Sequence, residues 1–148
     1  MKIFETQNDL DNEKAVCAHL TQVWGFNFFK LDRRYQADFL AVNKTGEAKA
    51  WVEIKCRKIA RQTYPDIILE LDKCMAMTGL AKATELPAIF VARWTDALGW
   101  IRIQPPFTIS YTGANDRYGL GGSPCVMLPV DQFKLVEMDN DRLSEQGT

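Results

Sequence analysis

The residues of this chain best suited to chemistry are two carboxylates and one lysine, Asp38, Glu53 and Lys55. Glu53 and Lys55 lie two apart within 51–57, where polar and apolar residues alternate as they do in a β-strand. Side chains two apart in a strand share a face, so we expect a carboxylate and an ammonium side by side. Asp38 opens a second alternating run, 37–42, and residues typical of a turn join the two runs. The pattern predicts a hairpin in which Asp38 can approach the Glu-x-Lys pair.

Two neighbouring carboxylates have a specific chemical use. They repel each other unless a hard cation lies between them, and carboxylate oxygens, a backbone carbonyl and waters are the ligands that Mg²⁺ prefers. Such a cation polarises a phosphoryl oxygen and activates water for in-line attack. The Lys55 ammonium would orient that water or neutralise charge that develops on the phosphate. The alternative is that Glu-x-Lys only solubilises an exposed strand face, which is common in proteins.

Composition narrows the class of protein. The chain has 148 residues, of which 47% are hydrophobic and 25% are charged, as in an ordinary folded domain. Its net charge of −1 argues against nucleic-acid binding through overall charge, so polyanion binding would need a local patch or a metal. One histidine and four scattered cysteines argue against a zinc site and a disulfide framework. Because no apolar run resembles a signal sequence or a membrane span, we expect a cytoplasmic protein with no membrane partner.

The helices that must position these residues follow from hydrophobic periodicity. Residues 6–24 predict an amphipathic helix that ends at Gly25, with Glu13 at the edge of its apolar face. Glu13 is therefore either a first-turn acid that interacts with the helix dipole or a group directed at a site. His19 falls outside the apolar stripe, so we expect it at the surface. A second helix is expected over 69–84.

The predicted fold is an α/β domain, 1–148, with the order α-β-β-β-α-β-β around a central mixed β-sheet flanked by helices. Its core is expected at about 6–104. An extension with a Gly-rich loop would follow at 105–138, and a frayed tail at 139–148. The core strands are expected at 26–31, 37–42, 51–57, 87–94 and 100–104.

Several predicted features occur together in an order that is known from other proteins. Glu13 lies on the first helix, and Asp38 lies at the start of the second strand. The order continues with Glu53-Ile54-Lys55 on a third strand, followed by a helix and another strand. In these features the chain resembles the PD-(D/E)XK nuclease superfamily, which has the restriction-endonuclease-like fold. It is most similar to the small members, the archaeal-type Holliday junction resolvases and short phage-encoded nucleases. One departure is that Ala37 replaces the proline of the motif, which does no chemistry.

The resemblance implies a divalent-metal-dependent phosphodiesterase that cleaves DNA as an endonuclease, with branched DNA among the candidate substrates. It implies that Asp38, Glu53 and the Ile54 carbonyl hold Mg²⁺ or Mn²⁺. Glu13 would reach the metal directly or through water, and Lys55 would serve the attacking water. The candidate contacts to DNA phosphates share a positive charge near the motif. They are Arg57, Lys58, Arg61, Arg34 and Lys73, together with Lys30 and Arg33.

Two alternatives from other classes stay open. One is a catalytically silent nucleic-acid-binding module of the same fold. The other is an α/β interaction protein with no nucleic-acid role, which the near-neutral charge permits. The sequence also leaves open whether the substrate is DNA or RNA, whether it is duplex, branched, nicked or single-stranded, and whether the chain forms a homodimer. A phage-encoded protein would act in the host cytoplasm.

Overall fold

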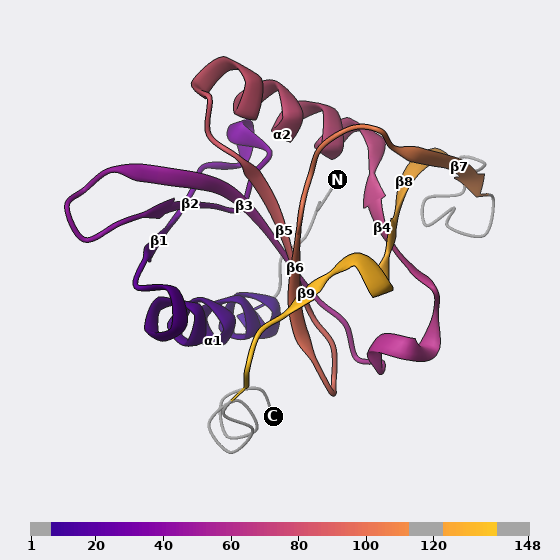
Figure 1. Cartoon of the computed structure of the whole chain (residues 1–148), viewed down its shortest axis with the longest axis horizontal. Helices are drawn as coiled ribbons and strands as arrows, with labels where there is room; N and C mark the ends of the chain where they lie inside the picture. The colour runs from indigo at the N-terminus through magenta and orange to yellow at the C-terminus, as the bar shows by residue number, and fades with distance from the viewer. Residues whose placement is uncertain (1–6, 113–122, 139–148) are drawn as a thin grey trace.

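A computed structural model describes residues 7–112 and 123–138, which form helices and two β-sheets (Figure 1). The helices are α1 (Gln7–Trp24) and α2 (Leu71–Thr84). The strands are β1 (Asn27–Lys30), β2 (Phe39–Val42), β3 (Ala48–Cys56), β4 (Asp66–Glu70), β5 (Ala88–Arg93), β6 (Leu98–Arg102), β7 (Thr108–Thr112), β8 (Ser123–Pro129) and β9 (Lys134–Leu135).

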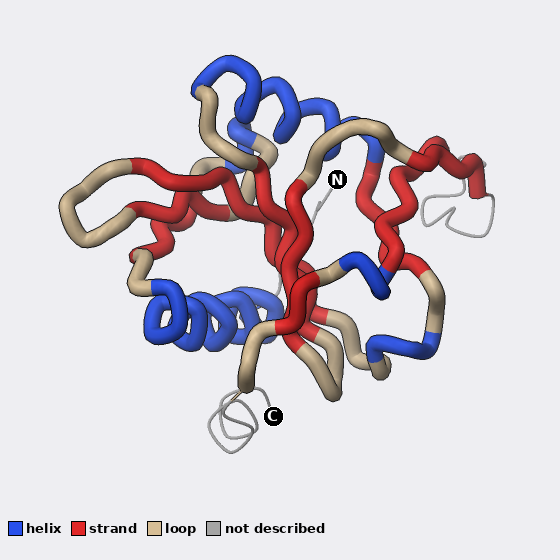
Figure 2. The backbone as a smooth tube through the Cα atoms, in the orientation of Figure 1, coloured by secondary structure: helices blue, strands red, loops and turns tan. Residues whose placement is uncertain are grey.

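The larger sheet is six-stranded and mixed, with the order β1-β2-β3-β5-β6-β9. Its central pair, β3 and β5, is parallel, whereas the other neighbours run antiparallel. A separate antiparallel sheet has the order β4-β8-β7 and lies at the side of the molecule (Figure 2). The prediction of a central mixed sheet flanked by helices is therefore confirmed.

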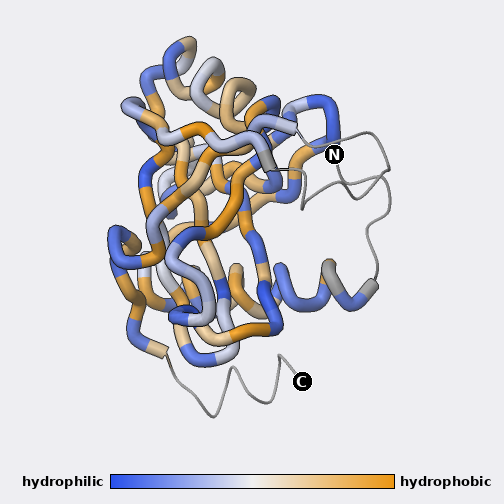
Figure 3. Tube along the Cα trace, turned by 90° about the vertical axis from the view of Figure 1, so that its right-hand side faces the viewer, coloured by the Kyte–Doolittle hydropathy of each residue, from blue (hydrophilic) through white to orange (hydrophobic). Residues whose placement is uncertain are grey.

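Helices cover both faces of the larger sheet, α1 on one side and α2 on the other (Figure 1). Leu20 of α1 belongs to the same buried cluster as Val52 and Ile54 of β3. On the opposite face, Met77 of α2 shares a cluster with Phe90 of β5 and with the inner residues of the small sheet. Figure 3 shows the apolar residues gathered along the central strands and the hydrophilic ones at many of the outer turns. Because both faces are packed, β3 carries its polar site residues through the interior of the protein.

The hairpin predicted around the motif is confirmed. Strands β2 and β3 pair antiparallel with Phe39 opposite Val52. In the turn between them, the Asn43 side chain accepts hydrogen bonds from the backbone N–H groups of Thr45 and Glu47, at 3.1 and 2.9 Å. Gly46 takes a φ of 89°, a conformation that costs a residue without Cβ very little. Local chemistry thus specifies this part of the fold.

The prediction that the second helix begins at residue 69 is wrong, because 66–70 form β4. In this strand Ile67 and Leu69 are buried, and Leu69 lies opposite Val126 of β8. The partner strand is distant in sequence, so pairing with it overrides the local helical pattern. The helix begins only at Leu71.

The expectation that His19 lies at the surface is also wrong. Its exposed fraction is 4%, and its Nε2 atom lies 2.7 Å from the backbone oxygen of Glu137. Val136 and Met138 pack against the same cluster as α1. The segment after β9 therefore covers this part of the helix, which no local pattern in α1 indicates.

Two predicted features fall outside the described residues: most of the Gly-rich loop, at 113–122, and the tail at 139–148. Within the described part of the chain, no helix is long and apolar enough to span a membrane.

The alternation of burial in β4 gives a test of this strand. Leu69→Ala removes a side chain with 1% exposure, so we expect it to lower the free energy of unfolding by about 3 kcal/mol. Ile68→Ala, on the opposite and half-buried face of the same strand, should cost about 1 kcal/mol. Urea denaturation measures both. Equal costs would contradict a strand with one buried face.

Candidate active site

The candidate site lies where β3 extends beyond its partner β2. Pairing with β2 ends at Val52, whereas pairing with β5 continues to Cys56. Beyond this last pair the Ile54 N–H has no partner in β2, and it donates instead to Oδ2 of Asp38 at 3.0 Å. In an extended strand the C=O of a residue leaves on the same edge as its N–H, so the Ile54 carbonyl faces the edge that Asp38 occupies. A carboxylate and a backbone carbonyl thus share this edge.

Glu53 contributes a second carboxylate from the interior of β3. It has no solvent exposure, and both of its oxygens accept hydrogen bonds from Nζ of Lys73 on α2, at 3.1 and 3.0 Å. Lys55 Nζ lies 3.6 Å from Oε2 of the same carboxylate. Burial, and then the nearby charge of Asp38, raise the pKa of Glu53 to about 7, while Lys73 and Lys55 act in the opposite direction.

Glu13 contributes the third carboxylate from α1, and it is also buried, with 3% exposure. Lys30, the last residue of β1, places its Nζ 3.0 Å from Oε1 of Glu13 and 3.8 Å from Oδ1 of Asp38. The same ammonium lies 4.9 Å from the centre of the Phe39 ring, which adds a cation–π contact. Lys30 therefore joins the acid of the helix to the acid beside β2.

These contacts bear on whether the site suits a metal. Carboxylates and a backbone carbonyl are the hard oxygen donors that Mg²⁺ and Mn²⁺ take, so the donor set fits in kind. In the described part of the chain, however, no three acidic, histidine or cysteine side chains form a ready metal-binding group. The carboxylate oxygens are instead in contact with Lys30 and Lys73. The structure therefore shows candidate metal ligands that are paired with lysines.

A thiol next to the site does not change this donor set. Burial raises the pKa of Cys17 to about 12, with the carboxylates of Glu13 and Asp38 adding to the effect and Lys30 opposing it. The thiol therefore stays protonated at neutral pH and is a poor metal ligand and nucleophile. Oxygen donors alone remain.

Three of the predicted phosphate contacts lie at or near the surface. Arg57 is half-buried, and its N–H donates to the Arg93 carbonyl at 2.8 Å, which extends the register of β3 by one residue. Alternation along the strand then places Arg57 on the face of Glu53 and Lys55. Lys58 follows and is exposed. Arg34 is also exposed, with a side-chain exposure of 76%.

Arg61 is placed differently. Its backbone N–H donates to Asp96 in the turn between β5 and β6, at 2.9 Å, and its guanidinium lies 3.9 Å from Asp131. Only 16% of its side chain is exposed. Arg61 therefore ties two connecting segments together.

The sequence predicts Lys73 and Lys30 only as candidate phosphate contacts, whereas in the structure both lie beside the buried carboxylates. Lys73 reaches Glu53 only because α2 begins at Leu71, after a strand that local periodicity does not reveal. Lys30 could have been found, since pairing of β1 with β2 puts it opposite Phe39 and hence next to Asp38.

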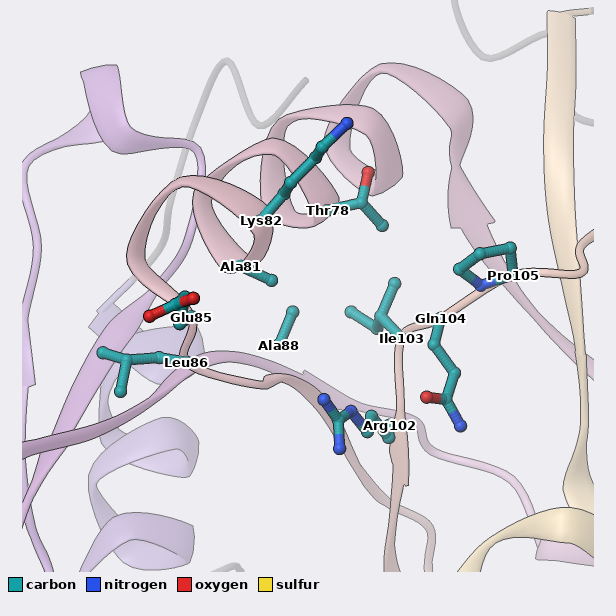
Figure 4. Close-up of a pocket in the computed structure, with 10 residues that line it drawn as sticks. All are labelled: Thr78, Ala81, Lys82, Glu85, Leu86, Ala88, Arg102, Ile103, Gln104 and Pro105. Carbon is teal, nitrogen blue, oxygen red and sulfur yellow. The ribbon is translucent and has the colours of Figure 1, made fainter.

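A pocket of about 240 Å³ lies elsewhere, between α2 and the ends of β5 and β6 (Figure 4). Lys82 and Arg102 are among its lining residues, whereas none of the carboxylates of the candidate site lines it. The two lysines of α2 thus belong to different surroundings, Lys73 beside the acids and Lys82 beside the pocket.

Comparison with known proteins identifies a matching family model and a solved structure of similar fold. A family model described as phage putative PDDEXK endonuclease matches residues 1–139. A search of curated proteins finds no match. Among solved structures, the chain is similar to Archaeoglobus fulgidus Hjc, a Holliday junction resolvase from an archaeal hyperthermophile, with a TM-score of 0.55 and 14% sequence identity. The similarity covers 88% of this chain and 94% of that one, and it concerns the fold.

The environment of Glu53 predicts a pH-dependent stability in metal-free buffer. Folding raises the pKa of this group from its ordinary value of 4.5 to about 7, so the folded state holds the proton more tightly. The stabilisation is complete below about pH 4.5 and is lost as the pH rises through 7, a change of about 3 kcal/mol. Glu53→Gln removes this dependence, so its stability relative to wild type should rise from about pH 5 to about pH 8. Urea denaturation in EDTA measures the difference, and a constant difference across that range would contradict the assignment.

Proposed function

The chain belongs to the phage putative PDDEXK endonuclease family, and from this premise we propose that it is a divalent-metal-dependent endonuclease that cleaves DNA. The observation that carries the proposal is the convergence of Glu13, Asp38 and Glu53 beside Lys55. The acids come from a helix, from the start of one strand and from the middle of the next. Ordinary surface charge does not explain them, since all three are buried.

In this proposal Asp38, Glu53 and the Ile54 carbonyl hold Mg²⁺ or Mn²⁺, and Glu13 contributes directly or through a water. The bound ion supplies positive charge to the scissile phosphate and lowers the pKa of water. The protein supplies the positions of the ligands. The hydrogen bond from Ile54 N–H fixes Asp38, and the sheet fixes Glu53.

Lys55 has the role of positioning water and stabilising charge. Its side chain is 16% exposed and shares a strand face with Glu53. In so dry a setting, an ammonium interacts strongly with negative charge that develops on a phosphate oxygen. Its contact with Glu53 is also longer than that of Lys73, 3.6 against 3.0 Å. Lys55 is therefore held near the carboxylate without sharing both of its oxygens.

DNA contacts are assigned to the cations that remain near the surface around the site, Arg57, Lys58 and Arg34. A net charge of −1 gives little long-range attraction, so a few phosphate contacts must supply the affinity. Branched DNA belongs among the substrates to be tested, because the similar solved structure is that of a Holliday junction resolvase.

The nuclease proposal predicts loss of cleavage when the carboxylates are neutralised. Asp38→Asn and Glu53→Gln should each reduce the rate by about 100-fold or more, because each removes a charged metal ligand. The assay uses labelled duplex, nicked, single-stranded and four-way-junction DNA, with RNA for comparison, in Mg²⁺ and in Mn²⁺. EDTA should abolish cleavage. Glu47→Gln, in the exposed turn of the same hairpin, is the matched control and should retain full activity. Undiminished cleavage by Glu53→Gln would refute the proposal.

The phosphate contacts predict a change in salt dependence. Arg57→Ala should weaken DNA binding whatever the sequence and lower the slope of log affinity against log salt by about one. Fluorescence anisotropy in Ca²⁺ would measure binding. Arg102→Ala, at the separate pocket, serves as the control and should leave the slope unchanged. If both variants behave alike, binding is diffuse and Arg57 is not a specific phosphate contact.

A further inference from the structure

The carboxylates of the candidate site are paired with lysines supplied by other elements. Lys73 of α2 donates to both oxygens of Glu53 at 3.0 and 3.1 Å. Lys30 of β1 lies 3.0 Å from Glu13 and 3.8 Å from Asp38. With Lys55 included, three ammonium groups stand among three buried acids.

Two of these ammonium groups, those of Lys73 and Lys30, contact the carboxylate oxygens that a metal ion would bind. A carboxylate oxygen that binds Mg²⁺ directs its lone pair to an ion about 2.1 Å away. An ammonium that donates hydrogen bonds to both Glu53 oxygens leaves little room for that ion, and it also repels a dication within a few ångströms. Lys55 presents a smaller obstacle, because it lies farther away and near one oxygen only.

The lysines can move aside. A lysine has a flexible four-carbon stem and a point charge without directional demands, so it can exchange one anion for another. The Lys30 side chain is already 40% exposed, and that of Lys73 is 16% exposed. An ammonium released from a carboxylate would have two kinds of anion within reach when substrate is bound, the Glu70 carboxylate, whose charge already interacts with Lys73, and the DNA phosphates.

We propose that Lys73 and Lys30 are internal counter-cations, which neutralise the site without metal and turn to the DNA phosphates when metal binds. This inference rests on the proposed function. It makes the lysines the link between metal binding and DNA binding. Metal binding releases the lysines to bind DNA phosphates, and DNA binding in turn draws the lysines away from the carboxylates that hold the metal. By thermodynamic reciprocity, metal strengthens DNA binding by the same factor by which DNA strengthens metal binding.

The first test is Mn²⁺ binding to the full chain without DNA, measured by electron paramagnetic resonance of free Mn²⁺. At about pH 8.5, Lys73→Met should bind Mn²⁺ about 10-fold more tightly than wild type. Lys82→Met removes another lysine from the same helix, beside the pocket, and should change nothing (Figure 4). Lys73→Gln keeps a hydrogen-bond donor without the charge, and it replaces the Met variant if circular dichroism shows that the latter does not fold. Unchanged or weaker Mn²⁺ binding by the folded variant overturns the inference.

The second test is the coupling itself. In wild type, Ca²⁺ should strengthen binding to uncleaved DNA relative to EDTA and raise the salt slope by about one to two, because additional cations reach phosphates. In Lys73→Met both gains should shrink, whereas Lys82→Met should keep them. Equal gains in Lys73→Met and wild type overturn the inference.

Glu53→Gln separates this inference from the proposed function. If that variant loses Mn²⁺ binding while Lys73→Met binds as wild type does, the metal site stands and the counter-cation role fails. If Glu53→Gln binds Mn²⁺ as wild type does, the metal is not at this site, and both the proposed function and the inference fail.

Discussion

The burial of Glu53 is the constraint on which the arrangement around it depends. A carboxylate with no solvent exposure in the middle of a sheet is unfavourable by several kcal/mol unless cations and hydrogen bonds surround it. Two lysines supply the positive charge. Lys55 comes from the same strand, and Lys73 comes from a helix on the face toward which Glu53 points. The pKa of the group nevertheless stays raised, so the cations offset burial only in part. The site is held at a cost to stability, as functional sites often are.

The interruption of strand pairing gives this buried acid its neighbours. Because β2 stops before the end of β3, the backbone of Ile54 is left to Asp38 instead of to another strand. The acid on α1 approaches from one face of the sheet and the lysine on α2 from the other. A sheet with complete pairing would keep the two faces apart. The open edge therefore brings together groups that the layered architecture otherwise separates.

The sequence could predict the parts of the site that depend on local structure. Asp38 directly precedes β2 and Glu53 lies on β3, and a short turn joins these two strands, so alternation and turn chemistry were enough to place the two acids together. The place of Lys73 depends on β4, which exists only because it pairs with β8, far along the chain. His19 is likewise buried by a segment more than a hundred residues away in sequence, at a separation of 118. Hydrophobic periodicity describes the faces of a single segment, whereas both errors concern contacts made by a second segment that is distant in sequence.

Under the proposed function, the charge balance of the site bears on how a near-neutral chain would bind a polyanion. Three acids and three lysines lie in contact at the site, so their opposite charges offset one another. The whole molecule, at −1, adds none. A dication among the acids changes the local sum to two positive charges without altering any residue. Under the proposed function, a bound ion would add to the attraction that Arg57, Lys58 and Arg34 exert on phosphates, because such an ion is the largest charge in its surroundings. Under the proposed function, DNA binding is therefore expected to be stronger in the metal-loaded protein than in the metal-free protein.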